Sequence, residues 1–189
     1  MKQYTIIGGV SGVGKSSLSG ILRQLLPDMG ILIDPNRIAA QEHCDRLTAE
    51  KLAISKEKDC LKKGINFSQE TTLSGRQTLQ TVQQAKTENY RIRLYYVGVS
   101  TLEESLLRIQ NRVRKGGHDT PVQDVYKQYE NRFADLAAVL PYCDNVHFYD
   151  NENGFQKIAC YQNGIIFPLT DRLPQWMQDF MNVQKTDCS

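Results

Sequence analysis

An eight-residue run near the N-terminus constrains the fold of this chain more than any other feature. Residues 9–16 read Gly-Val-Ser-Gly-Val-Gly-Lys-Ser, which fits the phosphate-binding pattern G-x-x-x-x-G-K-[ST]. A short, mostly apolar segment, 4–7, precedes the run, and apolar residues at helical spacing follow it from Leu18 to Leu25. A strand, a glycine-rich loop and a helix in this order are the context that such a loop requires. An ordinary glycine-rich turn is therefore disfavoured.

The chemistry of this run predicts nucleotide binding. Glycines let backbone N–H groups surround phosphate oxygens, and the start of the following helix adds a partial positive charge. The Lys15 ammonium can reach the β- and γ-phosphates, and the Ser16 hydroxyl can ligate Mg²⁺. ATP and Mg²⁺ are the expected cofactors. The residues expected to contact the nucleotide are Gly9, Val10, Ser11, Gly12, Val13, Gly14, Lys15, Ser16 and Ser17.

Length and composition favour one globular domain, 1–189, of which 40% is hydrophobic and 23% charged. The net charge of +2 argues against a dedicated nucleic-acid or membrane-surface protein, so we expect neither as a partner. No apolar run approaches the length of a membrane-spanning helix, and the N-terminus enters the first strand directly. The expected location is cytoplasmic. The cysteines are scattered without C-x-x-C spacing and are expected to be thiols in a reducing compartment: Cys44, Cys60, Cys143, Cys160 and Cys188.

Strand and helix patterns alternate along the chain. The predicted strands span 4–7, 31–33, 65–69, 92–99 and 145–149, and a hairpin turns at Asn163-Gly164. Beyond the first helix, one helix is predicted over roughly 39–63 with Gly64 as C-cap, and another from the stretch after Glu70 up to about Glu88. A third starts at Thr101 as N-cap, with Glu103 or Glu104 completing a capping box, and a fourth starts at Thr120 as N-cap, with Pro121 as its first residue. The last is predicted over 174–183. This order predicts a three-layer α/β P-loop fold of the kinase type, with a mostly parallel sheet covered on both faces.

Two acids stand at predicted strand ends, where ligands of such sheets bind. Asp34 follows the second strand, where it can support Mg²⁺ through water or act as a base; the alternative is a helix N-cap. Glu70 ends the third strand, where it can hold a metal-bound water or an acceptor hydroxyl; the alternative is a capping acid. Thr71 and Thr72 can hydrogen-bond a substrate or simply finish the strand.

The stretch 108–115 is basic and is followed by two glycines and His118. We expect a helical lid at about 108–132, in which Arg112 and Arg114 stabilise phosphate charge in the transition state. The alternative is the solvated face of an amphipathic helix. His118 contacts a phosphate or substrate, or is an ordinary loop histidine.

Taken together, these residues resemble the zeta toxin family, most closely its chromosomal zeta-toxin-like branch of P-loop ATPases. The resemblance covers most of the chain. Its markers are the G-x-x-x-x-G-K-S run, Asp34-Pro35-Asn36-Arg37-Ile38-Ala39, the run from Phe67 to Gly75 containing Glu-Thr-Thr-Leu-Ser-Gly, and the run from Arg112 to Pro121 containing Gly-Gly-His-Asp. The resemblance implies a P-loop kinase fold that uses ATP and Mg²⁺. In the toxins, the acceptor is a UDP-N-acetyl amino sugar that is phosphorylated on a ring hydroxyl.

Two departures from the family pattern concern catalysis. The family usually carries its presumed general base two residues after Asp34, and here that position is Asn36, whose amide cannot accept a proton. The family also has an arginine-rich helix start after Gly-Gly-His, whereas here Lys127 and Arg132 are the basic residues that remain. The residues expected to bind the acceptor are Asn36, Arg37, Glu70, Thr71, Thr72, His118 and Lys127, and those expected in catalysis are Lys15, Asp34, Glu70, Arg112 and Arg114.

The leading hypothesis is an ATP-dependent kinase that transfers a phosphoryl group to an alcohol of a small metabolite. One alternative is an ATP-binding module or slow ATPase, which Asn36 favours. The other is the toxin half of a toxin–antitoxin pair, with a small antitoxin-like protein as its partner.

Overall fold

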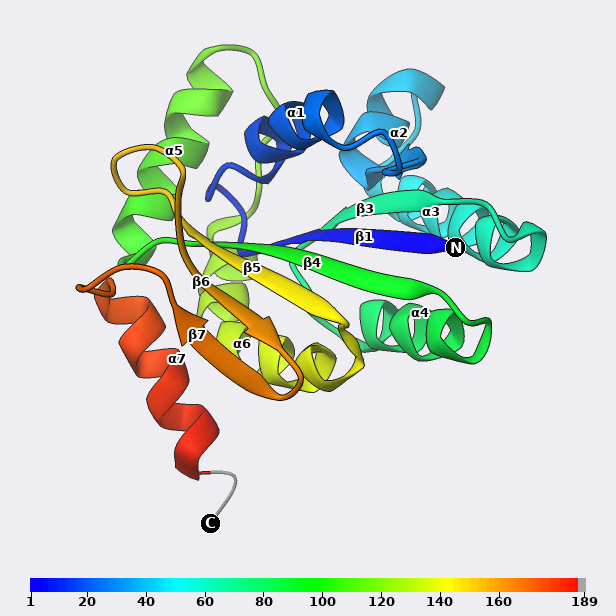
Figure 1. Cartoon of the computed structure of the whole chain (residues 1–189). Helices are drawn as coiled ribbons and strands as arrows, with labels where there is room; N and C mark the ends of the chain where they lie inside the picture. Colours follow the sequence, from blue (N-terminus) through cyan, green and yellow to red (C-terminus); the bar gives the residue numbers. More distant parts are fainter. Residues whose placement is uncertain (187–189) are drawn as a thin grey trace.

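The computed structural model describes residues 1–186, which contain a seven-stranded sheet in the order β2-β3-β1-β4-β5-β6-β7 (Figure 1). The strands are β1 (Gln3–Gly8), β2 (Ile31–Ile33), β3 (Phe67–Thr71), β4 (Arg91–Gly98), β5 (Asn145–Asp150), β6 (Gln156–Gln162) and β7 (Ile165–Pro168). From β2 to β5 all neighbours are parallel, and β6 and β7 add an antiparallel hairpin at one edge. The prediction of a mostly parallel sheet is confirmed, and the parallel strands all end at one edge of the sheet.

Helices cover both faces of the sheet, which confirms the three layers. The helices are α1 (Lys15–Leu25), α2 (Pro35–Glu42), α3 (Arg46–Lys63), α4 (Arg76–Thr87), α5 (Leu102–Arg114), α6 (Val122–Val139), a short 3₁₀ turn (Leu140–Tyr142) and α7 (Gln175–Thr186). One apolar cluster joins the sheet to α3, α4, α6 and α7, whereas a second cluster joins the opposite face to α1. Figure 1 shows α1 above the strands and α4, α6 and α7 below them. No helix among residues 1–186 is long and apolar enough to cross a membrane.

Several local signals produce the structure that they predict. Gly64 ends α3 with φ 66°, and Asn163 and Gly164 turn the β6–β7 hairpin with φ of 52° and 83°. Thr101 caps α5, since its Oγ1 accepts the Glu104 N–H at 3.3 Å. The carboxylate of Glu104, however, pairs with an arginine one turn later instead of completing the capping box.

Two predicted helix boundaries are wrong. The stretch 39–63 is not one helix, because α2 starts at Pro35 and ends where His43 adopts a left-handed conformation, φ 50°. Asp45 then starts α3 as a new N-cap, accepting the Thr48 N–H at 2.8 Å. Thr120 does not cap α6, because its Oγ1 accepts an Arg112 N–H at 3.2 Å, and Pro121 takes the N-cap position instead of the first helical one.

The four cysteines within residues 1–186 are free thiols, as expected. Cys60 and Cys143 are buried, whereas Cys44 and Cys160 are partly buried. Cys188 lies outside the described residues.

Candidate active site

The loop between β1 and α1 wraps around the amine of its own lysine. Lys15 Nζ donates hydrogen bonds to the carbonyls of Gly9 and Val10, both at 2.9 Å. Gly9 has φ 141°, and a Cβ at this position would lie 2.3 Å from the Val97 carbonyl oxygen. Only glycine fits this close approach, which brings the loop to the end of β4.

Charged groups from three segments act on the Lys15 amine. Desolvation lowers the pKa of Lys15 to about 8, Glu70 and Asp34 oppose this shift, and Arg112 adds to it. These carboxylates lie at the ends of β2 and β3, and Arg112 lies in α5. The parallel sheet therefore brings together the lysine and the two acids that the sequence singled out, and α5 adds one arginine of the predicted lid.

The side chains of Ser16 and Glu70 form a direct hydrogen bond. Ser16 Oγ donates to Glu70 Oε2 at 2.7 Å, and Glu70 is only 8% exposed. Burial raises the pKa of Glu70, Asp34 raises it further, and the hydrogen bond from Ser16 opposes the rise. A hydroxyl beside a carboxylate offers the oxygen ligands that Mg²⁺ prefers. Kinases and ATPases bind this ion through only one or two side chains, and the phosphates of the nucleotide supply further ligands. Within residues 1–186 no cluster of three or more His, Cys, Asp or Glu side chains forms a metal site, and the pair fits this sparse mode.

Asp34 lies at the end of β2 and caps α2. Its Oδ1 accepts the Asn36 N–H at 2.9 Å, so the N-cap interpretation applies to this oxygen. Oδ2 takes no hydrogen bond from residues 1–186, and it is the oxygen that can contact a substrate. Asn36 and Arg37 are exposed in the first turn of α2.

The hydroxyl of Thr71 is engaged in the turn after β3. Its Oγ1 accepts the Leu73 N–H at 3.0 Å and lies 3.0 Å from the Thr78 hydroxyl. Thr72, the next residue, is partly buried beside it. Thr71 therefore has a structural role that the sequence left open.

Of the predicted lid residues, Arg112 and His118 interact electrostatically with Lys15 of the phosphate loop. Arg112 Nε donates to the His118 carbonyl at 2.9 Å, and desolvation lowers the pKa of Arg112. Partial desolvation lowers the pKa of His118, and the charges of Arg112 and Lys15 lower it further, while Asp34 opposes them. Arg114 and Lys127 are exposed, and their side chains form no hydrogen bond or ion pair within residues 1–186.

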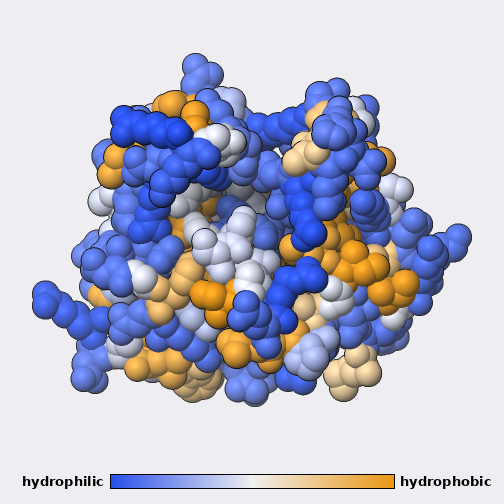
Figure 2. All heavy atoms as spheres, turned by 90° about the horizontal axis from the view of Figure 1, so that it is seen from above, coloured by the Kyte–Doolittle hydropathy of each residue, from blue (hydrophilic) through white to orange (hydrophobic). Residues whose placement is uncertain are grey.

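One face of α5 lines an open cavity of about 450 Å³. Its lining residues are Arg108, Asn111, Arg112, Lys115 and Gly117, so its charged groups are all basic. Figure 2 views the molecule from the side of α1 and α2 and shows a hollow with mostly hydrophilic rims. A basic lining is what a polyphosphate requires.

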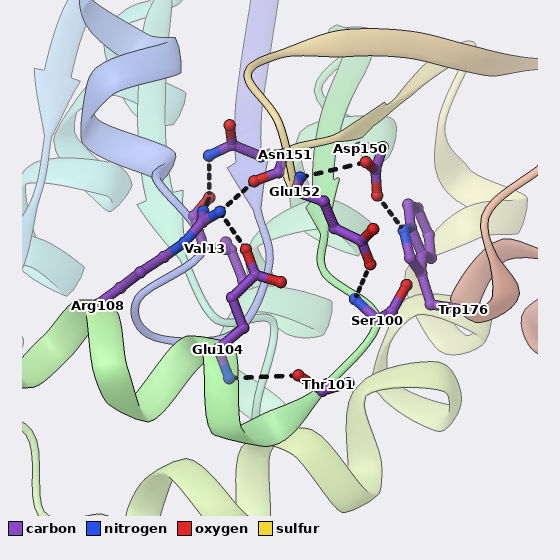
Figure 3. Close-up of polar contacts among 9 residues, drawn as sticks. All are labelled: Val13, Ser100, Thr101, Glu104, Arg108, Asp150, Asn151, Glu152 and Trp176. Carbon is purple, nitrogen blue, oxygen red and sulfur yellow. Dashed lines mark hydrogen bonds and ion pairs between the residues drawn. The ribbon is translucent and has the colours of Figure 1, made fainter.

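The structure adds two contacts to the phosphate loop that sequence reasoning missed. Gln128, which is 8% exposed in α6, accepts the Ser11 N–H at 3.0 Å. Asn151, at the end of β5, donates from Nδ2 to the Val13 carbonyl at 2.8 Å. Figure 3 shows Asn151 and Arg108 pointing toward Val13. One sequence signal could have indicated Asn151: it lies just after a predicted strand, as Asp34 does.

The zeta toxin family model matches residues 37–163, which is more than half of the chain. The chain belongs to the zeta toxin family. The matched range starts after the phosphate loop, so the assignment of that loop rests on its own sequence and geometry. An uncharacterised protein of Haemophilus influenzae is 33% identical over 115 residues, which cover 58% of this chain and 80% of that protein.

Solved structures share the fold at low sequence identity. A chain of the PezAT chromosomal toxin–antitoxin system of Streptococcus pneumoniae superposes with a TM-score of 0.65 and 16% identity, over 98% of this chain and 86% of that one. A chain of the AvrRxo1-ORF1:-ORF2 structure with ATP superposes with a TM-score of 0.65 and 15% identity, over 89% of this chain and 61% of that one. Shikimate kinase from Bacteroides thetaiotaomicron superposes with a TM-score of 0.50 and 12% identity, over 97% of each chain. These similarities establish a P-loop fold of the kinase type.

Proposed function

We propose that this member of the zeta toxin family is an ATP-dependent phosphotransferase that acts on a hydroxyl group of a small metabolite. The observation that carries the proposal is the meeting of Lys15, the Ser16–Glu70 pair and Asp34 at one edge of the sheet, with Arg112 beside them. Phosphoryl transfer needs phosphate charge neutralised and an acceptor held in line, and these residues supply both requirements.

Each group has a role that follows from its position. Lys15 and the loop N–H groups bind the β- and γ-phosphates, and Arg112 approaches the same charge from α5. Ser16 and Glu70 would hold Mg²⁺, with Asp34 contributing through water. The metal, when bound, neutralises charge that develops on the phosphate oxygens. His118 lies near both Asp34 and Lys15, where it can contact a phosphate or the acceptor.

Asp34 is the acid that we assign to the acceptor hydroxyl. Asn36 cannot accept a proton, and it is exposed on α2, whereas Asp34 Oδ2 has no hydrogen-bond donor within residues 1–186 and the Asp34 charge acts on the Lys15 amine. Membership of the zeta toxin family supports a UDP-N-acetyl amino sugar as the acceptor. Family membership and the fold shared with PezAT also support a small antitoxin-like protein as a partner.

Phosphorus NMR of the protein with Mg²⁺, ATP and UDP-N-acetylglucosamine tests the proposal. We expect a new phosphomonoester resonance, and we expect Asp34→Asn to reduce its rate by roughly 100-fold or more because a general base is lost. Asparagine is also a good N-cap, so α2 keeps its start, and the loss of ATP affinity should be much smaller than the loss of rate.

The control for this experiment is Lys15→Ala, which should weaken ATP binding strongly and abolish turnover. Inorganic phosphate as the sole product, with every hydroxyl acceptor tried, would show an ATPase and overturn the transferase assignment. An unchanged transfer rate in Asp34→Asn would show that Asp34 is not the base.

A further inference from the structure

The carbonyl of Val13, within the phosphate loop, accepts hydrogen bonds from two residues that are distant in sequence. Asn151 Nδ2 donates to it at 2.8 Å, and Arg108 Nη1 donates to it at 3.4 Å (Figure 3). The peptide that joins Val13 to Gly14 is trans, so its C=O and its N–H point in opposite directions. Fixing the carbonyl therefore also fixes the direction of the Gly14 N–H, on the opposite side of the loop.

The contact between Asn151 and the loop depends on a glycine. Gly14 has φ 101°, and a Cβ at this position would lie 2.6 Å from Asn151 Nδ2. Gly14 thus meets two demands, a left-handed backbone and the close approach of an amide side chain. The approach is possible only because position 14 lacks a side chain.

Both donors are themselves held in place. The Asn151 backbone N–H donates to the Gly98 carbonyl at 3.2 Å, where β4 ends. Arg108 donates to the Asn151 carbonyl and pairs with Glu104 one turn earlier in α5. The position of the Val13 carbonyl is therefore set by β4, β5 and α5 together.

The turn that carries Asn151 is anchored on its other side as well. Trp176 Nε1, from α7, donates to Asp150 Oδ1 at 2.8 Å. Glu152 Oε1 accepts the Ser100 N–H at 3.2 Å. Because the residues on either side of Asn151 are tied to separate elements, the side chain has little freedom to leave Val13.

We propose that Asn151 and Arg108 are positioning residues of the phosphate loop: they hold the Val13 carbonyl outward so that the Gly14 N–H faces the nucleotide phosphates. This inference rests on the proposed binding of ATP. Neither residue needs to touch the phosphoryl group that is transferred. Their effect reaches the nucleotide through the Val13–Gly14 peptide.

The test is Asn151→Ala, measured by calorimetric titration with Mg²⁺ and ATP and by steady-state kinetics. Loss of one hydrogen bond should weaken ATP binding about 3- to 10-fold. KM for ATP should rise by the same factor with kcat unchanged, since the peptide binds ground state and transition state alike. Asn151→Asp, which keeps the shape but replaces the donor with a carboxylate, should weaken binding more. The matched control is Asn153→Ala, an exposed residue of the same turn whose side chain forms no hydrogen bond within residues 1–186.

A second measurement needs no nucleotide. Amide hydrogen exchange at Gly14 and Lys15 should be faster in Asn151→Ala and unchanged in Asn153→Ala, because the loop loses its clamp. Wild-type protein that binds no ATP would overturn the proposed function and this inference with it. Wild-type binding together with unchanged affinity and exchange in Asn151→Ala would overturn the inference alone.

Discussion

Two effects on the protonation of the Lys15 amine oppose each other, burial in the loop and the charge of a bound phosphate. Desolvation in the loop lowers its pKa to about 8, and its partners there are carbonyl oxygens. A phosphate would replace those neutral acceptors with negative charge, which favours the protonated form. The protonation of one side chain therefore links nucleotide affinity to pH.

The sign of this link is fixed by the form of Lys15 that binds. The ammonium is the major form below pH 8 and is lost as the pH rises through 8, so ATP affinity should be flat from pH 7 to 7.5 and fall above pH 8. With one linked proton, the fall approaches about tenfold per pH unit. Calorimetric titration between pH 7 and 9.5 measures it. Lys15→Met should bind weakly and without this pH dependence, and a flat wild-type profile up to pH 9.5 would contradict the link.

Of the residues at the candidate site, the sequence singled out those that lie in a motif or at a strand end. Lys15, Ser16 and Glu70 are of this kind, because a parallel sheet brings its strand ends to one edge. Gln128 and Asn151 were missed, since they contact the loop across 117 and 138 residues of sequence. A single amide residue in a helix or turn has no spacing pattern, so only the folded chain shows which carbonyl or N–H it meets.

At the scale of elements, one wrong helix boundary came from a side chain with a competing partner, and the other came from a left-handed residue followed by a local cap. Thr120 has the residue type of an N-cap, but its hydroxyl accepts a hydrogen bond from Arg112. His43 has no sequence signal for a left-handed conformation, yet it divides the long polar stretch into α2 and α3. Asp45, whose carboxylate caps α3, is the local signal that the sequence analysis missed, whereas at Thr120 a tertiary contact overrode the local preference.

Helix α3 carries a buried acid that ties it to two neighbours. Glu57 is 1% exposed; its Oε1 accepts Gln69 Nε2 at 2.6 Å and its Oε2 accepts the Thr81 hydroxyl at 2.8 Å. Burial raises the pKa of Glu57, and hydrogen bonds from Thr81, Gln77 and Gln69 oppose the rise. This carboxyl thus connects α3 with α4 and with β3, the strand that also carries Glu70.

The raised pKa predicts a pH dependence of stability that Glu57→Gln should remove. The native state binds the Glu57 proton more tightly than the unfolded chain, with its usual pKa of 4.5. The contribution of this group is therefore complete below pH 4.5 and is lost as the pH rises through the native pKa. Urea unfolding at pH 4.5 and pH 7 should show that Glu57→Gln gains stability relative to wild type at the higher pH.

The control for this prediction is Glu88→Gln, which changes an exposed carboxylate at the end of α4. It should leave the difference in unfolding free energy between the two pH values unchanged. The same difference in wild type and in Glu57→Gln would show that burial of this acid does not affect stability.

At the scale of the whole molecule, α7 connects the C-terminal part of the chain to the edge of the sheet that carries the candidate site. Trp176, Met177 and Phe180 are almost completely buried against the sheet. A Cβ on Gly98 would lie 2.4 Å from the Trp176 ring, which shows how closely the indole covers the end of β4. The same indole donates to Asp150, the residue before Asn151.

Gly98→Ala should therefore weaken both the fold and the site. Its φ is not in the left-handed region, so the effect is steric: the methyl group displaces Trp176 and lowers the free energy of unfolding by roughly 1–3 kcal/mol. The matched control is Gly20→Ala on α1, where a Cβ meets no atom within 4 Å. That variant should be more stable than wild type by about 0.5–1 kcal/mol, because alanine replaces glycine inside a helix.

Thermal and urea unfolding measure the stability of both variants, and titration with Mg²⁺ and ATP at a temperature where each is folded measures the site. Because Trp176 holds Asp150, its displacement in Gly98→Ala should loosen the turn that carries Asn151 and weaken ATP binding, whereas Gly20→Ala should bind as wild type does. A destabilised Gly98→Ala protein with unchanged ATP affinity would show that α7 stabilises the sheet without positioning the phosphate loop. Wild-type stability in Gly98→Ala would mean that the indole moves aside freely, and then α7 could not hold the Asp150 turn in place.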